Sequence, residues 1–354
     1  MTGKLVLITG TGRSGTSTMS GALHHLGLSV PGPYLGANES NPKGFFESSW
    51  AVSFHKAIEK RAGIQDFDGR PEAIELATAA ITTDDRDRLR TWLLEHRAGQ
   101  DAAEQVVVKD PRSVWAQGLW KQAAADVDLS IRYVAMLRHP AETVGSRSTY
   151  YASKADAQRR RHYEVASVAR WVNSSLITER GTRGELRAFA PYVELLENWR
   201  PVMGRVADRL GLVYDPDPSV TPHPVDDFID PDLRRVRVGW DDLEVPSGLR
   251  AMAQDVWDCL MRLASGDDPD PAVQAELDKL HDAYAALYLD SRAICNDAVD
   301  AAATPPVKAA RRRPAKKAAA PAGPEDRLVR DVRSGDLVRL LGRRVSRRAA
   351  QLRR

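Results

Sequence analysis

Short apolar runs alternate with longer helical patterns along the chain. Four runs are bounded by turn-forming or charged residues and predict buried strands, the last more weakly than the others: Leu5–Ile8, Val106–Val108, Tyr133–Leu137 and Phe189–Leu196. Apolar residues at helical spacing lie between these runs and predict helices over Thr16–Leu26, Ala51–Ala62, Asp84–His96, Val114–Ala125 and Arg159–Thr178. Strands that alternate with helices predict an α/β fold in three layers, in which a parallel sheet is flanked by helices.

The C-terminal part of the chain has a different pattern. Residues 245–294 are predicted to be wholly helical. Residues 301–326 are rich in Ala, Pro, Lys and Arg, a composition typical of a disordered linker. Beyond them, residues 327–354 predict a basic amphipathic helix. We therefore expect an α/β domain over 1–300, a linker over 301–326 and a basic tail helix over 327–354.

Charge is distributed unevenly over these parts. Residues 1–300 carry 35 Lys and Arg against 44 Asp and Glu, a net charge of −9, and residues 301–354 carry 16 against 4, a net charge of +12. No apolar run approaches the roughly 20 residues of a membrane-spanning helix, and the first apolar stretch is too short for a signal peptide. We expect a cytoplasmic protein in which Cys259 and Cys295 stay reduced, and no Cys/His cluster has the spacing of a metal site.

The segment LVLITGTGRSGTST near the start of the chain fits two phosphate-binding templates. Gly10, Gly12 and Gly15 match the G-x-G-x-x-G of dinucleotide folds, while Gly10 and Gly15 also frame a P-loop, with Thr16 where a lysine is usual. In both templates glycines let backbone N–H groups approach a phosphate. The dinucleotide template also needs a second strand ending in an acidic residue about 20 positions later, but that region, GLSVPGPYLGANES, is broken by prolines. The P-loop template therefore fits better, with Arg13 as the cation inside the loop.

Two motifs together resemble sulfotransferases that use 3′-phosphoadenosine 5′-phosphosulfate (PAPS), a family with a P-loop-like fold. GRSGTS, which contains Arg13, is similar to the family's 5′-phosphosulfate loop. In RYVAMLRHPAETVGSR a predicted strand precedes Arg138, and Ser146 follows eight positions later, as in the family's motif for the 3′-phosphate. NPKGFFE, VVVKDPR and YVELLENWRPVMGRVADRLGL resemble the bacterial branch that modifies glycans and lipids, although Val193 stands where relatives usually have an acidic residue. The resemblance spans roughly residues 4–215.

The resemblance implies transfer of the sulfuryl group of PAPS to a hydroxyl group of a glycan, a glycolipid or a related small acceptor. Arg138 and Ser146 would hold the 3′-phosphate of the nucleotide. The leaving 5′-phosphate would be bound by the loop and the first turn of the next helix, through Arg13, Ser14, Gly15, Thr16 and Ser17. Because a sulfuryl group carries less charge than a phosphoryl group, we expect no metal ion in the reaction.

A general base must accept the proton of the acceptor hydroxyl, and Glu47 is the first candidate. It follows two aromatic residues that we expect to shield it from water, although it would serve equally well as a carboxylate at a helix N-terminus. Glu39 is the second candidate, ahead of His24 and His25. Lys109 ends a predicted strand, where open sheets bind ligands. It would contact the sulfuryl oxygens or an acidic acceptor, and a lysine that only caps the strand is the alternative.

Other functions stay open beside this one. An ATP-dependent, kinase-like P-loop phosphotransferase would use Asp110 for Mg²⁺, but the chain lacks the P-loop lysine. A non-enzymatic, nucleotide-binding scaffold on a membrane would leave Arg138 and Ser146 without a role. The tail over 327–354 predicts peripheral binding to an anionic membrane surface. One alternative role of the tail is docking on the acidic domain of its own or a neighbouring chain. The other is non-specific binding of nucleic acid, and we do not favour nucleic acid as a partner. The sequence indicates no oligomeric state.

Overall fold

The computed structural model describes residues 3–36, 43–97, 105–151, 156–230, 234, 237–266 and 268–303. The chain divides into one unit over Met1–Asp297 and a second over Ala298–Arg354. The predicted linker over 301–326 begins inside α12 (Pro271–Ala303), so its first residues are helical, while residues 304–326 and the predicted tail helix over 327–354 lie outside the described residues. Among the helices that the structure describes, none is both long and apolar enough to cross a membrane.

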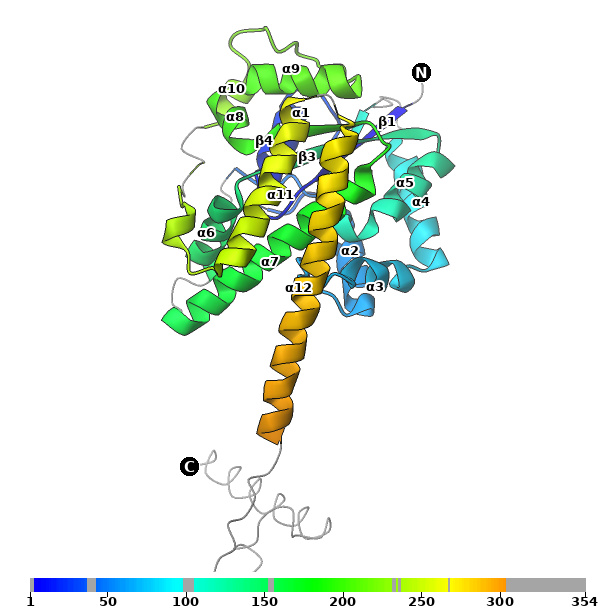
Figure 1. Cartoon of the computed structure of the whole chain (residues 1–354). Helices are drawn as coiled ribbons and strands as arrows, with labels where there is room; N and C mark the ends of the chain where they lie inside the picture. The colour runs from blue at the N-terminus through cyan, green and yellow to red at the C-terminus, as the bar shows by residue number, and fades with distance from the viewer. Residues whose placement is uncertain are drawn as a thin grey trace, which may run out of the picture. The chain divides into compact units, whose positions relative to one another are not determined.

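In the described part of the chain, four parallel strands form a sheet in the order β2-β1-β3-β4. Figure 1 labels β1, β3 and β4 among the surrounding helices. They are β1 (Gly3–Thr9), β2 (Gln105–Lys109), β3 (Leu129–Leu137) and β4 (Arg187–Pro191). In the register of the sheet, Leu5 of β1 lies between Val106 of β2 and Ile131 of β3. β1 is therefore a central strand, and the carboxyl ends of all four strands share the edge where open parallel sheets bind ligands.

Helices cover both faces of the sheet because successive strand residues point to opposite sides. On one face, Val6 and Ile8 pack with α1 (Thr16–His25), α8 (Tyr192–Glu197), α9 (Trp199–Leu210) and α10 (Pro224–Phe228). On the other, Leu5 and Leu7 pack with α2 (Ser49–Ala62), α4 (Thr83–Arg97) and α5 (Gln117–Asp126). β3 and β4 bury further apolar residues against α6 (Pro140–Tyr151), α7 (Ala157–Thr182), α11 (Ser247–Ser265) and α12 (Pro271–Ala303). The predicted three-layer α/β fold is confirmed.

The sequence predicted a single strand over Phe189–Leu196, but the structure divides this run between a strand and a helix. β4 ends at Pro191, and α8 begins at the next residue, Tyr192. Leu195 and Leu196 remain buried, but they pack from the helix against the core shared with α1. An apolar run of this length fits a buried strand and a buried helix equally well, so the hydrophobic pattern could not locate the boundary.

Two predicted helices are interrupted in the structure. The pattern over Val114–Ala125 begins as a 3₁₀ helix, η1 (Pro111–Ala116), and continues as α5. Residues 245–294 form two helices, α11 and α12, where the sequence predicted unbroken helix. Gly266 and Pro269 lie between these two helices. They explain the break, because glycine weakens a helix and proline lacks the N–H that would continue it. Elements that the hydrophobic pattern did not predict include α9, α10 and the short α3 (Ala73–Ala80) and η3 (Trp240–Asp242).

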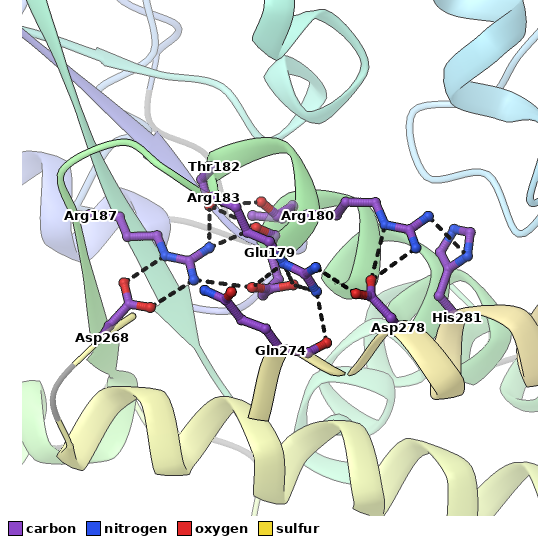
Figure 2. Close-up of polar contacts among 10 residues, drawn as sticks. Glu179, Arg180, Thr182, Arg183, Arg187, Asp268, Gln274, Asp278 and His281 are labelled. Atoms are coloured by element: carbon purple, nitrogen blue, oxygen red, sulfur yellow. Dashed lines mark hydrogen bonds and ion pairs between the residues drawn. The ribbon is translucent and has the colours of Figure 1, made fainter. Parts of the chain in front are cut away.

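A buried ionic cluster joins α7 to β4 and to α12 (Figure 2). Arg187, at the start of β4, is 1% exposed and donates two hydrogen bonds to the carboxylate of Asp268, at 2.7 and 2.8 Å. It also donates to the carboxylate of Glu179 in α7 at 3.0 Å and to its carbonyl at 2.7 Å. Arg183 binds the same carboxylate and donates to Asp278 of α12 at 2.8 Å. The cluster therefore fixes both long helices to an edge strand of the sheet.

Replacing Asp268 with alanine is expected to destabilise the fold strongly. The substitution leaves the buried Arg187 with one carboxylate instead of two, and breaking a buried pair from one side typically costs about 3–5 kcal/mol. The free energy of unfolding, measured by urea denaturation, should therefore fall by about 3–5 kcal/mol. Asp241→Ala removes the partner of Arg250 at the surface, where such pairs contribute about 0–1 kcal/mol, and serves as the control. Equal losses for both variants would contradict a special role for the cluster.

Candidate functional site

The loop between β1 and α1 has a backbone that only glycine can adopt at two positions. Gly10 and Gly15 have φ angles of 123° and 92°, in the left-handed region. A Cβ atom at Gly10 would lie 2.7 Å from the carbonyl oxygen of Met136, and one at Gly15 would lie 2.1 Å from the ring of Tyr192. Arg13 also has a positive φ of 75°, which is uncommon for a residue with a side chain and clusters at ligand-binding sites.

The first turn of α1 is free of competing acidic side chains. Gly15 occupies the N-cap position, supplies no side-chain cap, and no Asp or Glu lies in the first turn. The N–H groups of such a turn and the positive end of the helix dipole attract an anion. The side chain of Thr11 in the same loop has a buried hydroxyl with no hydrogen-bond partner among the described residues. Both observations fit a loop shaped around a bound phosphate or phosphosulfate group.

The second motif meets this loop in the structure. Arg138 follows β3 directly, and its Nη1 donates a hydrogen bond to the carbonyl oxygen of Arg13 at 3.0 Å. The side chain of Arg13 in turn donates from Nε to the hydroxyl of Ser146 in α6 at 3.2 Å. Arg13, Arg138 and Ser146 are therefore brought together from two segments more than 120 residues apart. The two predicted phosphate-binding motifs form one continuous basic site.

The guanidinium of Arg138 is held by further contacts. It is buried, and its Nε donates to the carboxylate of Glu142 at 3.2 Å. Its charge lies 4.9 Å from the centre of the Tyr192 ring, which also packs against Gly15 of the loop. Burial lowers the pKa of Arg138, and Tyr192 and Glu142 oppose that shift, so the side chain keeps its positive charge. Glu142 and Tyr192 were not among the predicted site residues.

Lys109 and Glu47, predicted separately, form a buried ion pair beside the loop. Lys109 ends β2, and its Nζ contacts the Oε1 atom of Glu47. The same ammonium group donates to the hydroxyl of Ser17 in α1 at 2.9 Å and to the carbonyl of Phe45 at 3.3 Å. Burial lowers the pKa of Lys109, and the charge of Glu47 opposes this. Three acceptors match the three protons of an ammonium group, so the lysine fixes the carboxylate next to the first turn of α1.

Two predicted residues have surroundings that the sequence did not suggest. The N–H and the hydroxyl of Ser14 both donate to the carbonyl of Thr11, at 3.1 and 2.6 Å, so its side chain shapes the loop from within. Glu47 is buried, as expected, and the ring of Phe45 lies 5.9 Å from Nζ of its partner Lys109, whereas the ring of Phe46 packs with those of His24, His25, Tyr34 and Phe228. Thr16 is buried at the start of α1. Glu39, the second candidate for the base, lies outside the described residues.

An aromatic residue that the sequence analysis missed covers the loop. A Cβ atom at Gly12 would lie 2.6 Å from the ring of Phe67, so this ring packs directly on the glycine. The guanidinium of Arg147, next to Ser146, lies 4.7 Å from the centre of the same ring. Phe67 therefore contacts both the loop and α6. It lies in a polar stretch between two helices, where no periodic pattern identifies it.

A hydrogen-bonded network occupies both carboxylate oxygens of Asp110, the residue after Lys109. Trp120 donates to Nε2 of His55 at 2.8 Å, so the proton of the imidazole lies on Nδ1 and is donated to Asp110, also at 2.8 Å. The other oxygen of Asp110 accepts hydrogen bonds from the backbone N–H and the side chain of Arg112, at 3.1 and 2.9 Å. Burial raises the pKa of Asp110, but the hydrogen bond from His55 and the charge and hydrogen bonds of Arg112 outweigh it and lower the pKa. Asp110 therefore stabilises the turn after β2.

Metal-ligating side chains do not gather at this site. Within the described residues, no group of three or more His, Cys, Asp or Glu side chains is placed to hold a metal ion. Cys259 is buried and Cys295 is exposed, and neither forms a disulfide. Charged groups beside the loop include the guanidinium groups of Arg13, Arg138 and Arg147 and the Lys109–Glu47 pair.

Sulfotransferase domains are among the solved structures that match the chain. One is the sulfotransferase domain from the Synechococcus PCC 7002 olefin synthase, which is 14% identical, covers 80% of this chain and 94% of its own, and has a TM-score of 0.36. Another is the sulfotransferase domain from the curacin biosynthetic pathway, with 14% identity, coverage of 78% and 96%, and a TM-score of 0.33. No family model matches the chain, and no curated protein matches it.

Proposed function

We propose that this chain is a sulfotransferase that moves the sulfuryl group of PAPS to a hydroxyl group of an acceptor. The observation that carries the proposal is the contact between the two phosphate-binding motifs, in which Arg13 bridges from the loop to Ser146 and Arg138 binds the backbone of Arg13. A nucleotide with phosphates at both the 5′ and the 3′ position matches two adjoining basic sites on neighbouring strand ends. The 5′ group would lie on the N-terminus of α1, and the 3′-phosphate beside Arg138 and Ser146.

The site favours PAPS over ATP. A P-loop that uses ATP has a lysine for the β- and γ-phosphates and an acidic residue for Mg²⁺. Here Thr16 replaces that lysine, and both oxygens of Asp110 are engaged by His55 and Arg112. A second basic site on the neighbouring strand has no counterpart in the ATP template, whereas a 3′-phosphate accounts for it. Sulfotransfer therefore explains more of the charged residues than phosphotransfer does.

The residues supply the two groups that sulfuryl transfer needs. The acceptor oxygen forms a bond to sulfur while the bond from sulfur to the 5′-phosphate oxygen breaks, and the acceptor's proton passes to a base. Glu47 is the proposed base, because Lys109 holds its carboxylate beside Ser17 at the start of α1. Arg13 and the N–H groups of the loop would stabilise the negative charge that grows on the leaving phosphate. Lys109 would also attract the sulfuryl oxygens.

The identity of the bound nucleotide tests this proposal directly. Adenosine 3′,5′-bisphosphate (PAP), the product left after transfer, should raise the melting temperature, whereas ATP with Mg²⁺ and NAD should not. A ligand present at a hundred times its dissociation constant stabilises a fold by about 2.7 kcal/mol, which is a measurable shift. Thermal unfolding of the full chain with each nucleotide at equal concentration gives the comparison. Stabilisation by ATP or NAD alone would point to the kinase-like or the dinucleotide alternative.

We further propose that the acceptor is a glycan or glycolipid and that the basic tail binds an anionic membrane surface. The tail places apolar residues at Leu328, Val332, Leu337, Leu341 and Val345 at helical spacing, with arginines between them. Each basic residue near such a surface contributes about 1 kcal/mol before screening by salt. In co-sedimentation at low salt, the full chain should bind vesicles that contain anionic lipid, and a 1–303 truncation should not. Equal binding by both chains, or none by either, would contradict this role.

A further inference from the structure

Glu142 lies between two arginines at the proposed 3′-phosphate site. It belongs to the first turn of α6, and its side chain is 8% exposed. One carboxylate oxygen accepts a hydrogen bond from Nε of Arg138 at 3.2 Å, and the other contacts Nη2 of Arg234. Arg234 comes from the segment between α10 and α11, so one carboxylate joins the strand-end arginine to a distant part of the chain.

The contacts of Arg138 define the direction of its guanidinium group. Glu142 holds the Nε edge, the carbonyl of Arg13 accepts from Nη1, and the ring of Tyr192 lies over the charge at 4.9 Å. A guanidinium binds a phosphate best through two parallel N–H bonds, which requires a fixed plane. Without Glu142, rotation about the last side-chain bonds would cost little, because an arginine side chain has several rotatable bonds.

A carboxylate at this place is unexpected on electrostatic grounds alone. A negative charge close to an anion site repels the anion, and burial strengthens that repulsion. If Glu142 only balanced charge, its removal would leave a more positive site and a tighter phosphate complex. If Glu142 instead orients Arg138, its removal weakens phosphate binding, because a misdirected guanidinium loses its paired hydrogen bonds. The two roles therefore differ in the sign of their effect on binding.

We propose that Glu142 is a positioning residue that selects nucleotides carrying a 3′-phosphate, by orienting Arg138 and by holding Arg234 at the same site. This inference rests on the proposed function, because it assumes that Arg138 binds the 3′-phosphate. Glu142 does not touch the nucleotide in this role. It acts through the two arginines that its carboxylate contacts.

The test compares PAP with AMP, which lacks the 3′-phosphate, by isothermal titration of the full chain. Glu142→Gln leaves one acceptor oxygen for two arginines, so it should weaken PAP binding about tenfold or more, the usual effect of losing a hydrogen bond to a charged group, and leave AMP binding within about twofold. Glu142→Asp keeps the charge but withdraws the carboxylate by one methylene group, so it should also weaken PAP binding. Glu194→Gln removes an exposed carboxylate paired with Arg205 and should change neither affinity.

The outcomes separate this inference from the proposed function. If the native chain binds PAP no better than AMP, the two-phosphate site itself is wrong. If the native chain prefers PAP but Glu142→Gln binds it equally well or more tightly, the function stands and the positioning role is overturned. Native affinity of Glu142→Asp for PAP would overturn the positioning role as well. Equal weakening of PAP and AMP in the Glu142 variants would indicate a general structural role and would also overturn the inference.

Discussion

Replacing Glu47 with glutamine is expected to lower turnover by about 10²- to 10⁴-fold while PAP binding persists, since removal of a general base has effects of this size. The amide keeps the shape of the carboxylate and can still accept a hydrogen bond from Lys109, so the site should stay assembled. It cannot take the proton of the acceptor hydroxyl. Turnover is measured as the release of PAP at saturating PAPS in the presence of an acceptor. PAP affinity is measured separately, by titration.

Glu59 provides a matched control for this substitution. It lies in α2, is buried like Glu47, and has a pKa that burial and the nearby Asp66 raise to about 8, although Arg112 opposes the shift. At pH 7 its carboxyl group is therefore protonated, and glutamine resembles that state closely. Glu59→Gln should leave turnover near the native value. Native turnover in Glu47→Gln itself would remove Glu47 from the mechanism and make Glu39 or a histidine the base.

The kinase-like alternative makes a different prediction for the same residues. A metal-dependent phosphotransferase would lose activity when Asp110 is replaced, because that residue would bind Mg²⁺. In the structure Asp110 supports η1 and accepts a hydrogen bond from Nδ1 of His55, so its loss acts first on folding. Charge neutralisation at the proposed site would come instead from Arg13, Arg138 and Lys109. Fixed cations of this kind stabilise a leaving phosphate without a metal ion.

The local parts of the site could be predicted because each depends on a short stretch of sequence. The loop needs glycines at positions of positive φ, and Gly10 and Gly15 supply them directly after an apolar run. Arg138 follows another apolar run, and parallel strands place their carboxyl ends at one edge of the sheet. Those two facts already imply that Arg13 and Arg138 lie near each other, and the structure confirms this with a 3.0 Å hydrogen bond.

The contacts between distant side chains could not be predicted in the same way. Lys109 and Glu47 were each expected near the site, but nothing in the spacing shows that one binds the other. Phe67 and Tyr192 pack on Gly12 and Gly15 through rings contributed by segments that carry no phosphate motif. Such contacts depend on how helices pack on the sheet, which hydrophobic periodicity does not determine. Whether each of these residues binds the nucleotide stays a prediction.

Replacing Arg138 with alanine is expected to abolish the preference of the chain for PAP over AMP. The native site should bind PAP more tightly, because the 3′-phosphate gains charge-assisted hydrogen bonds from Arg138 and Ser146. Without the guanidinium, the 5′ group still has the loop and α1, so AMP binding should change little, while PAP should fall to a similar affinity. A loss of about ten- to a hundredfold for PAP corresponds to hydrogen bonds between charged groups.

Two variants make this last result specific. Arg138→Lys keeps the positive charge but cannot donate two parallel hydrogen bonds, so it should restore only part of the preference. Arg132→Ala removes an arginine from the other end of the same strand, where its Nε donates to the carbonyl of Leu210 at 3.3 Å, and should leave the preference intact. If Arg138→Ala retains native discrimination between PAP and AMP, the 3′-phosphate is bound elsewhere. The contact between Arg138 and Arg13 would then serve only to fix the loop to β3.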